Sequence, residues 1–136
     1  MAGLLHELGD LIVGAYMPEA YASILQGAVE RGCRTFEVEE ERLGFSHAEI
    51  GAYLLGIWGL PQPIVDAVAH HHHPTRMPHS GFDPMTAVYV ADLLAGRGPD
   101  SPILQHDQDC LEELGLTQKF AEWRKTLPFH TLAAGA

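Results

Sequence analysis

Apolar residues recur at intervals of three and four along most of this 136-residue chain, and no stretch alternates convincingly between apolar and polar residues. The interval matches the 3.6-residue turn of an α-helix, whereas a half-buried strand repeats every second residue. The first segment shows the pattern with Leu4, Leu8 and Leu11 on one face. The chain is therefore predicted to be all-α, a bundle of about six to seven helices.

Start and stop signals divide this pattern into segments. Pro18 suits the first turn of a helix, and Ser46 with Glu49 forms a capping box ahead of another. The segment 60–63 is a break, because neither of its prolines can sit inside a helix. The predicted helices cover about 2–16, 18–32, 36–43, 47–59, 63–73, 85–95, 107–114 and 117–127.

Charge and cysteine content limit the expected partners and compartment. The net charge is −10 and the eight Lys and Arg residues are scattered, so neither nucleic acid nor an anionic membrane is expected to bind. The acidic run Glu37 with Glu39 to Glu41 is interpreted as a solvated helix face. Cys33 and Cys110 are expected to be free buried thiols. No signal peptide or membrane span is found, which predicts a cytoplasmic protein.

Nine histidines are many for a chain of this length, and several lie on faces expected to point inward. His71 and His72 continue an apolar stripe, while Asp92 sits inside an apolar helix, where a carboxylate is costly unless paired or ligated. His6 and Asp10 are four residues apart and are expected to share one helix face. Glu7 lies beside this pair, Asp10 is a candidate supporting residue, and His47 opens the capped helix on the face of Ile50 and Leu54.

Each of these residues also has a simpler explanation. A histidine on an apolar face is usually a hydrogen-bonded core residue, and His70 to His73 could be a solvent-facing helix end. Asp92 could pair with a buried histidine and do nothing else. Together, however, four predicted helices bring His or carboxylate inward, as helical bundles do in metal sites. Such a site suits Fe, Mn, Zn or Ni and can activate water for hydrolysis.

Several motifs in a fixed order resemble the HDOD domain. They are His6-Glu7-Leu8-Gly9-Asp10, Pro18-Glu19-Ala20-Tyr21, Glu39 to Gly44, His47 to Ala52, Leu54 to Pro61, Ile64 to Pro74 and Val90-Ala91-Asp92. The resemblance covers roughly residues 3–95 and implies an HD-like helical bundle. Residues 1–98 would be the C-terminal part of an HDOD-like domain that is truncated at its N-terminal side. Residues 99–136 would be a helical extension with a loose tail.

HDOD domains are similar to the HD superfamily of metal-dependent phosphohydrolases, which includes phosphodiesterases that cleave cyclic di-GMP. By position, His6 and Glu7 match the HD pair of that superfamily. The later ligands match His47, His71, His72 and Asp92. HDOD proteins generally act as regulatory or output modules in bacterial signalling, and the resemblance implies the same role for this chain.

Departures from the active enzymes favour binding over catalysis. Glu7 replaces the aspartate of the HD pair, Asp10 replaces the lysine that follows it, and no Gly-Tyr-Pro follows the histidine run. The helices that precede the HD motif, with an upstream histidine ligand, are not found. We therefore expect a non-catalytic signalling module that binds a partner or ligand. The alternatives are a metal-dependent phosphohydrolase or cyclic-dinucleotide phosphodiesterase, and a bundle whose histidines only form hydrogen bonds.

Two expectations concern exposure. Helices missing before the HD motif would leave the face of Leu4, Leu8 and Leu11 uncovered, so a homo-oligomer or a protein partner is expected. Trp58, beside Leu60 and Pro61, is expected to pack in the core rather than to form a binding platform.

Overall fold

The regular secondary structure of this chain is entirely helical. The computed structural model describes residues 1–78, 81–96 and 103–126, and no strand occurs within these ranges, which confirms the all-α prediction. The helices are α1 (Ala2–Leu5), α2 (Leu8–Tyr16), α3 (Pro18–Arg31), α4 (Thr35–Leu43), α5 (His47–Ile57), α6 (Gln62–Ala69), α7 (Pro84–Gly96), α8 (Gln105–Glu113) and α9 (Thr117–Thr126), with a 3-10 turn at Pro74–Arg76. None of the described helices is both long and apolar enough to cross a membrane.

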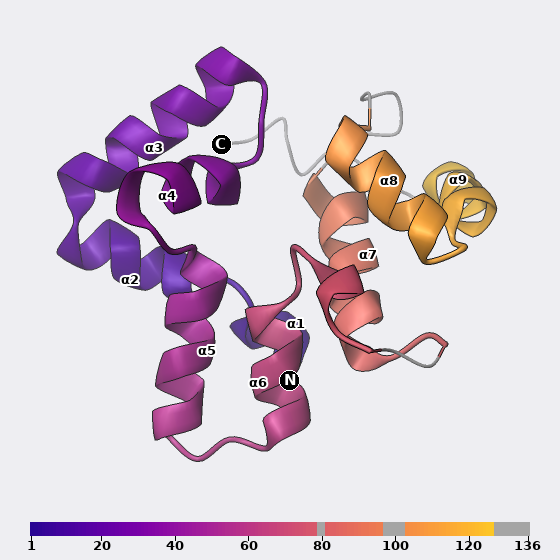
Figure 1. Cartoon of the computed structure of the whole chain (residues 1–136), viewed down its shortest axis with the longest axis horizontal. Helices are drawn as coiled ribbons and strands as arrows, with labels where there is room; N and C mark the ends of the chain where they lie inside the picture. The colour runs from indigo at the N-terminus through magenta and orange to yellow at the C-terminus, as the bar shows by residue number, and fades with distance from the viewer. Residues whose placement is uncertain (79–80, 97–102, 127–136) are drawn as a thin grey trace.

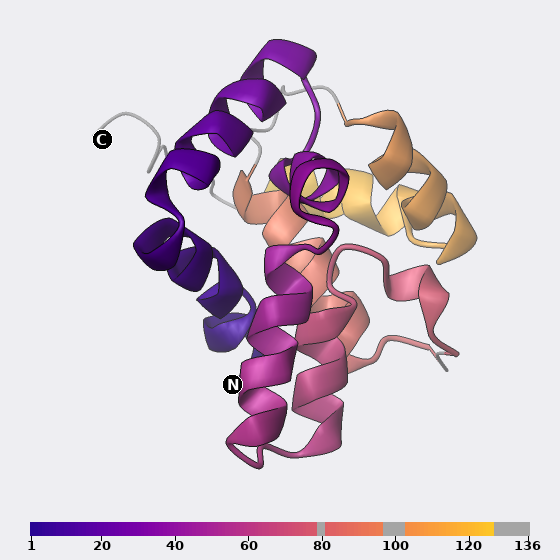
Figure 2. The same ribbon diagram turned by 60° about the vertical axis from the view of Figure 1, so that its left-hand side comes forward.

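The described helices pack around several apolar clusters. Helix α2 packs on α5, α5 and α6 form a hairpin, and α3 packs on α4 (Figure 1). Leu55 of α5 and Val68 of α6 are fully buried at the centre of this part. Helix α7 lies between α6 and the α8–α9 pair, as Figures 1 and 2 show. Its residues Tyr89 and Leu93 form a second apolar cluster with Leu111 of α8 and Phe120 of α9.

Helices α2 and α5 approach each other with almost no space between their backbones. A Cβ atom added to Gly9 would lie 1.8 Å from the carbonyl oxygen of His47, and one added to Gly51 would lie 3.2 Å from the amide nitrogen of Gly9. Only glycine permits such close backbone contact. The contact sets the turn before α2 directly beside the first residue of α5.

Two predicted helices end earlier than expected because a histidine binds the helix backbone. The predicted helix 2–16 is split between α1 and α2, where the His6 ring donates to the Gly3 carbonyl at 2.8 Å. Helix α6 ends at Ala69 rather than near His73, and the His71 ring donates to the Val68 carbonyl at 2.7 Å. Each ring takes a carbonyl that the next helical amide would otherwise use. The expectation that His6 and Asp10 share one helix face was therefore wrong.

Trp58 does not pack in the core, so that prediction was wrong. Its side chain is 61% exposed, and the neighbouring Ile57 is 64% exposed. Trp58 is the residue that ends α5, followed by Gly59 with a φ of 75°. The turn therefore lies at the tip of the α5–α6 hairpin (Figure 1), and more than half of the Trp58 side chain is exposed there.

The face of the first two helices is covered only in part. Leu4 and Leu11 are 89% and 71% exposed, whereas Leu8 packs against the cluster that α5 and α6 form.

Cys33 and Cys110 are free thiols, with Cys33 half-buried and Cys110 buried.

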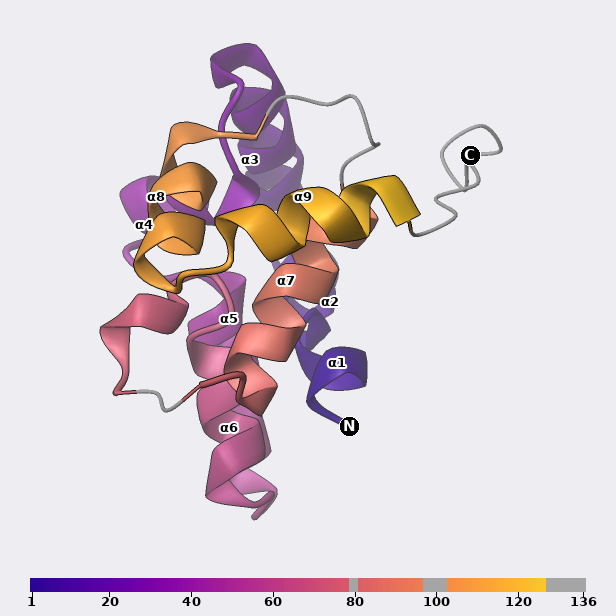
Figure 3. The same ribbon diagram turned by 90° about the vertical axis from the view of Figure 1, so that its right-hand side faces the viewer.

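The predicted extension is helical in the part that the structure describes. The predicted helices 107–114 and 117–127 correspond to α8 and α9, which pack on α7 (Figure 3). The predicted boundary between residues 98 and 99 and the predicted loose tail after residue 126 lie outside the described residues.

Candidate functional site

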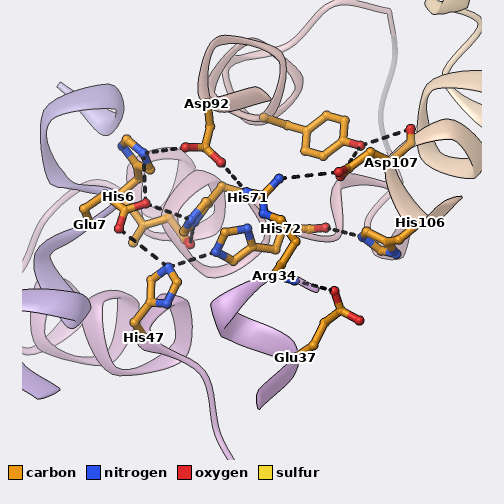
Figure 4. Close-up of polar contacts among 12 residues, drawn as sticks. His6, Glu7, Arg34, Glu37, His47, His71, His72, Asp92, His106 and Asp107 are labelled. Carbon is orange, nitrogen blue, oxygen red and sulfur yellow. Dashed lines mark hydrogen bonds and ion pairs between the residues drawn. The ribbon is translucent and has the colours of Figure 1, made fainter. Parts of the chain in front are cut away.

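All six predicted ligands lie within one cluster in the middle of the chain's fold (Figure 4). They come from the turn between α1 and α2, the first residue of α5, the turn after α6 and the middle of α7: His6, Glu7, His47, His71, His72 and Asp92. His6 Nε2 lies 3.3 Å from Glu7 Oε1 and 3.7 Å from Asp92 Oδ1. Segments far apart in the sequence therefore bring their histidines and carboxylates together as predicted.

Three buried histidines form the centre of this cluster. Each histidine contributes one ring nitrogen, and these three nitrogens lie within 4.8 Å of one another. The residues are His47, His71 and His72. His47 Nε2 and His72 Nε2 are 2.8 Å apart, so one nitrogen donates a hydrogen bond to the other. The alternative of a solvent-facing helix end is wrong for His71 and His72, which are 0% and 5% exposed.

His71 presents a free nitrogen to the centre of the cluster. Its Nδ1 is bound to the Val68 carbonyl, which leaves Nε2 as a lone pair, and Nε2 is buried without a hydrogen-bond partner. Burial lowers the pKa of His71 to about 4, and it also lowers the pKa of His72 well below the usual range. Both rings are therefore neutral at pH 7, the form in which imidazole binds metals. The nearest carboxylate oxygen of Glu7 lies 3.9 Å from His71 Nε2.

Glu39 belongs to the site although the sequence interpretation placed it on a solvated face. Its carboxylate is 0% exposed and accepts hydrogen bonds from the backbone amide of His47 at 2.8 Å and from His47 Nδ1 at 2.7 Å. Burial depresses the pKa of His47, but the hydrogen bond and charge of Glu39 outweigh it, and the pKa is raised. The spacing of Phe36, Glu39 and Leu43 at three and four could have indicated that Glu39 points inward.

Asp10 lies beside this pair rather than among the six ligands. It accepts a 2.7 Å hydrogen bond from the Tyr21 hydroxyl, and one of its oxygens lies within 4.8 Å of Glu39 and His47 ligand atoms. Burial raises the pKa of Asp10. Its supporting role stays a prediction.

Arg34 is a site residue that the sequence analysis missed. It precedes α4, and its Nη2 lies 2.6 Å from Asp92 Oδ2 while its Nη1 lies 3.6 Å from Asp107 Oδ2. Its guanidinium carbon also lies 5.9 Å from the centre of the Phe36 ring. Arg34 and Asp92 are 58 residues apart in sequence, and no local pattern signals such a pair. One partly buried cation therefore joins the start of α4 to α7 and α8.

Helix α8, which lies in the predicted extension, forms hydrogen bonds with residues of the site and of α7. The Nε2 of His106 donates to the backbone carbonyl of His72 at 3.1 Å. Asp107 is 1% exposed and accepts a long 3.3 Å hydrogen bond from the Tyr89 hydroxyl. No periodic signal marks His106 or Asp107, because their role depends on how α8 packs against α7.

The donor set fits one metal ion better than it fits two. His47, His71 and His72 offer ring nitrogens, and Glu7 lies 3.9 Å from both His47 Nε2 and His71 Nε2. Histidine with one carboxylate suits Zn, Mn, Fe or Ni. Asp92, by contrast, already faces two cations, since His6 and Arg34 lie on different oxygens of its carboxylate.

The pair of His6 and Asp92 predicts a pH dependence of stability. The ion pair with Asp92 raises the pKa of His6 from 6.5 to about 10. Burial works against ionisation of Asp92, but His6 and Arg34 outweigh it and lower its pKa to about 2 from 3.8. The stabilisation by His6 is complete below pH 6.5 and is lost as the pH rises towards 10. The stabilisation by Asp92 is complete above pH 3.8 and is lost as the pH falls towards 2.

We therefore expect the melting temperature to fall between pH 6.5 and 10, and His6→Gln to remove part of this fall. Circular dichroism melts of both proteins across this range measure the effect. His70→Gln, in the same histidine run but outside the cluster, should melt with the pH profile of the unmodified protein. Parallel profiles for His6→Gln and the unmodified chain would contradict the assignment.

Comparison with known proteins identifies the domain family of this chain. The sequence profile of the HDOD domain matches residues 1–74. An uncharacterized protein of Treponema pallidum (strain Nichols) is 31% identical over 93 residues, which are 68% of this chain and 18% of that protein. The chain thus spans less than a fifth of the length of this relative.

A solved structure shares the fold. The crystal structure named "Putative phosphohydrolase from Shewanella amazonensis SB2B" aligns with a TM-score of 0.65 and 26% sequence identity. The alignment covers 90% of this chain and 48% of the Shewanella chain, so this chain spans about half of it. The similarity confirms the predicted HD-like helical bundle.

Proposed function

Because this chain belongs to the HDOD domain family, we propose that it is a bacterial signalling module that acts by binding a partner or ligand and not by catalysis. The observation that carries this proposal is the ion pair between Arg34 and Asp92. In the HD superfamily resemblance, Asp92 is a metal ligand. Here a guanidinium nitrogen lies 2.6 Å from one of its oxygens, and His6 lies 3.7 Å from the other.

This arrangement opposes the metal centre of an active enzyme. A metal ion bound at Asp92 would have to displace Arg34 and would lie close to a second positive charge on His6. Breaking a buried ion pair costs about 3–5 kcal/mol when one charge is left behind, which a weakly held ion does not offset. The cluster satisfies its own charges, and this supports a structural and binding role.

A second candidate function, a metal-dependent phosphohydrolase, is favoured by His71. Its Nε2 is a buried lone pair without a partner, directed at Glu7. His47, His71, His72 and Glu7 would hold one divalent cation, which supplies Lewis acidity to a phosphoryl group. Glu39 would fix His47 in one tautomer through its 2.7 Å hydrogen bond. The name of the Shewanella protein agrees with this alternative.

Metal content and turnover distinguish the two functions. Tag-free protein would be incubated with Mn²⁺, Fe²⁺, Zn²⁺ or Ni²⁺, dialysed, and analysed by elemental mass spectrometry. The same samples would be assayed with bis(4-nitrophenyl) phosphate and with cyclic di-GMP. We expect far less than one ion per chain and no hydrolysis above the protein-free metal blank.

Two variants make this experiment specific. The double variant His47→Ala, Asp92→Ala removes cluster residues, whereas His70→Ala removes a histidine of the same run that lies outside the cluster. Near-stoichiometric metal together with hydrolysis would contradict the proposal and favour the phosphohydrolase. Both should then be lost in the double variant and kept in His70→Ala.

The partner is a further part of this proposal. Leu4 and Leu11 expose apolar side chains on the first two helices, and an exposed apolar face of this kind commonly binds another protein or a second copy of the same chain. The net charge of −10 disfavours nucleic acid and anionic membranes as partners. We propose that the protein acts in the cytoplasm, where its two free cysteines would stay reduced.

A further inference from the structure

A pocket lies at the other end of α7 from the histidine cluster. It is bounded by Gly81 and Phe82 before α7, by the first turn of α7, and by the α8–α9 turn with the adjoining face of α9. Its volume is about 490 Å³, within the usual range for small-molecule sites. Thr86 in this pocket and Asp92 in the cluster are six residues apart on α7, roughly 9 Å along the helix axis. The two sites are therefore separate.

Two aromatic rings form one wall of this pocket. The Phe82 and Trp123 rings lie edge to face, with centroids 6.0 Å apart. Phe82 is 58% exposed, which is unusual for a ring that already has an aromatic neighbour. An edge-to-face pair leaves the flat face of at least one ring free, and a planar ligand would cover it.

The Thr86 hydroxyl lacks a partner. Thr86 lines the pocket and is 1% exposed, yet its Oγ1 is buried without a hydrogen bond, while its backbone amide is bound to Asp83 at 2.8 Å. A buried hydroxyl of this kind is costly unless something binds it. It can both donate and accept, so it suits a nitrogen or oxygen atom in a ligand ring.

A cation lies on the same side of the pocket as Trp123. Lys119 and Trp123 are four residues apart on α9, follow Leu116 on the same face, and all three line the pocket. Lys119 is exposed, and no acidic residue is among the described residues of the lining. Lys119 is therefore the one charged residue in the described lining, on a chain of net charge −10, which favours a ligand with one anionic group over a polyanion.

We propose that this pocket binds a small planar heteroaromatic molecule that carries a single anionic group. The ring stacks on the Phe82–Trp123 wall, a ring heteroatom binds the Thr86 hydroxyl, and the anionic group binds Lys119. A nucleoside monophosphate and a heteroaromatic carboxylic acid share this chemistry. The inference does not depend on whether the histidine cluster is catalytic.

Isothermal titration calorimetry tests the proposal with two probes and their uncharged counterparts. The probes are adenosine 5′-monophosphate and indole-3-carboxylate, and the counterparts are adenosine and indole. We expect at least one probe to bind more tightly than about 1 mM, and its counterpart to bind about tenfold more weakly. The probe that binds identifies the source of the ligand. No binding by either probe would overturn the proposal.

Variants locate the bound probe. Lys119→Gln should weaken binding of the charged probe about tenfold but leave its counterpart unchanged, and Lys125→Gln, on α9 but outside the pocket lining, should have no effect. Thr86→Val should weaken both probe and counterpart, yet its melting temperature should be equal or higher because the lost hydroxyl had no partner. Equal affinity in Lys119→Gln, Thr86→Val and the unmodified protein would overturn the proposal.

Trp123 itself reports on the site. The chain has two tryptophans, and Trp58 lies at the tip of the α5–α6 hairpin. In a Trp58→Phe background, adenosine 5′-monophosphate or indole-3-carboxylate should shift the Trp123 side-chain Nε1–H signal in a ¹H–¹⁵N spectrum. An unshifted signal at a probe concentration that saturates the calorimetric binding would overturn the assignment to this pocket.

Discussion

Gly9→Ala is expected to destabilise the protein by about 3 kcal/mol or more and to lower its melting temperature by roughly 10 °C. The added Cβ would lie 1.8 Å from the His47 carbonyl oxygen and 2.6 Å from its carbonyl carbon. These are backbone atoms at the start of α5, so no side-chain rotation can relieve the overlap. Helix α2 would have to move away from α5, and the apolar contact between the two helices would be lost.

The same movement would disturb the candidate site. Gly9 follows Glu7 by two residues, and His47 provides both the clashing carbonyl and a cluster imidazole. We expect the distance between Glu7 and His47 to increase together with the loss of stability. Urea denaturation measures the free energy of unfolding, and the His47 ring signals in ¹H–¹⁵N spectra report the displacement.

Gly56→Ala is the matched control for this variant. Gly56 also lies in a helix, α5, but a Cβ added there would have nothing within 4 Å. Alanine is favoured over glycine inside a helix, so this variant should be more stable by about 0.5–1 kcal/mol. If Gly9→Ala were as stable as Gly56→Ala, the close packing of α2 on α5 would be wrong.

The order of helices could be predicted from the sequence because it depends on local patterns, and the six clustered residues could be predicted because their motifs follow a fixed order along the chain. Apolar spacing indicated the helices, and the resemblance to HDOD domains identified His6, Glu7, His47, His71, His72 and Asp92. The errors have a common physical cause, which is that a polar side chain can leave the solvent if a distant partner binds it. Glu39 looked like part of a charged surface, yet it is buried by its two hydrogen bonds to His47.

Local competition for carbonyl groups explains the misplaced helix ends. Periodicity alone predicted one helix through His6 and another through His71, but each ring binds a backbone carbonyl and ends the helix there. Trp58 shows the opposite error, because a large aromatic residue in a periodic pattern lies at the tip of a hairpin, where its side chain is 61% exposed. Arg34 had no signal, since its partners are on helices far along the chain.

Arg34→Met is expected to lower the free energy of unfolding by about 3–5 kcal/mol, because it removes the cation beside the buried Asp107 carboxylate and one of the two cations beside Asp92. Asp92 and Asp107 have side chains only 19% and 1% exposed. Methionine keeps the apolar stem beside Phe36, so the loss reports charge rather than packing. Arg31→Met removes the 2.6 Å ion pair of Arg31 with Glu41 on the surface, and this control should scarcely change stability.

Neutralising one carboxylate should recover part of that loss. In the double variant Arg34→Met, Asp107→Asn, the more buried of the two carboxylates that face Arg34 is neutral, and we expect a higher free energy of unfolding than in Arg34→Met alone. Equal stabilities in urea denaturation would mean that Arg34 does not stabilise α8 through Asp107.

Arg34→Met also tests whether Arg34 keeps metal ions out of the histidine cluster. If Arg34 keeps metal from the cluster by neutralising Asp92, Arg34→Met at a temperature where it stays folded should bind Mn²⁺ or Zn²⁺ more tightly than the unmodified chain. The extra affinity should disappear when Asp92→Asn is added, because the freed carboxylate is the ligand gained. Unchanged metal affinity in Arg34→Met would mean that Asp92 is not the position at which the arginine opposes a metal ion. The expected lack of turnover would then be attributed to Glu7, the altered residue of the HD pair.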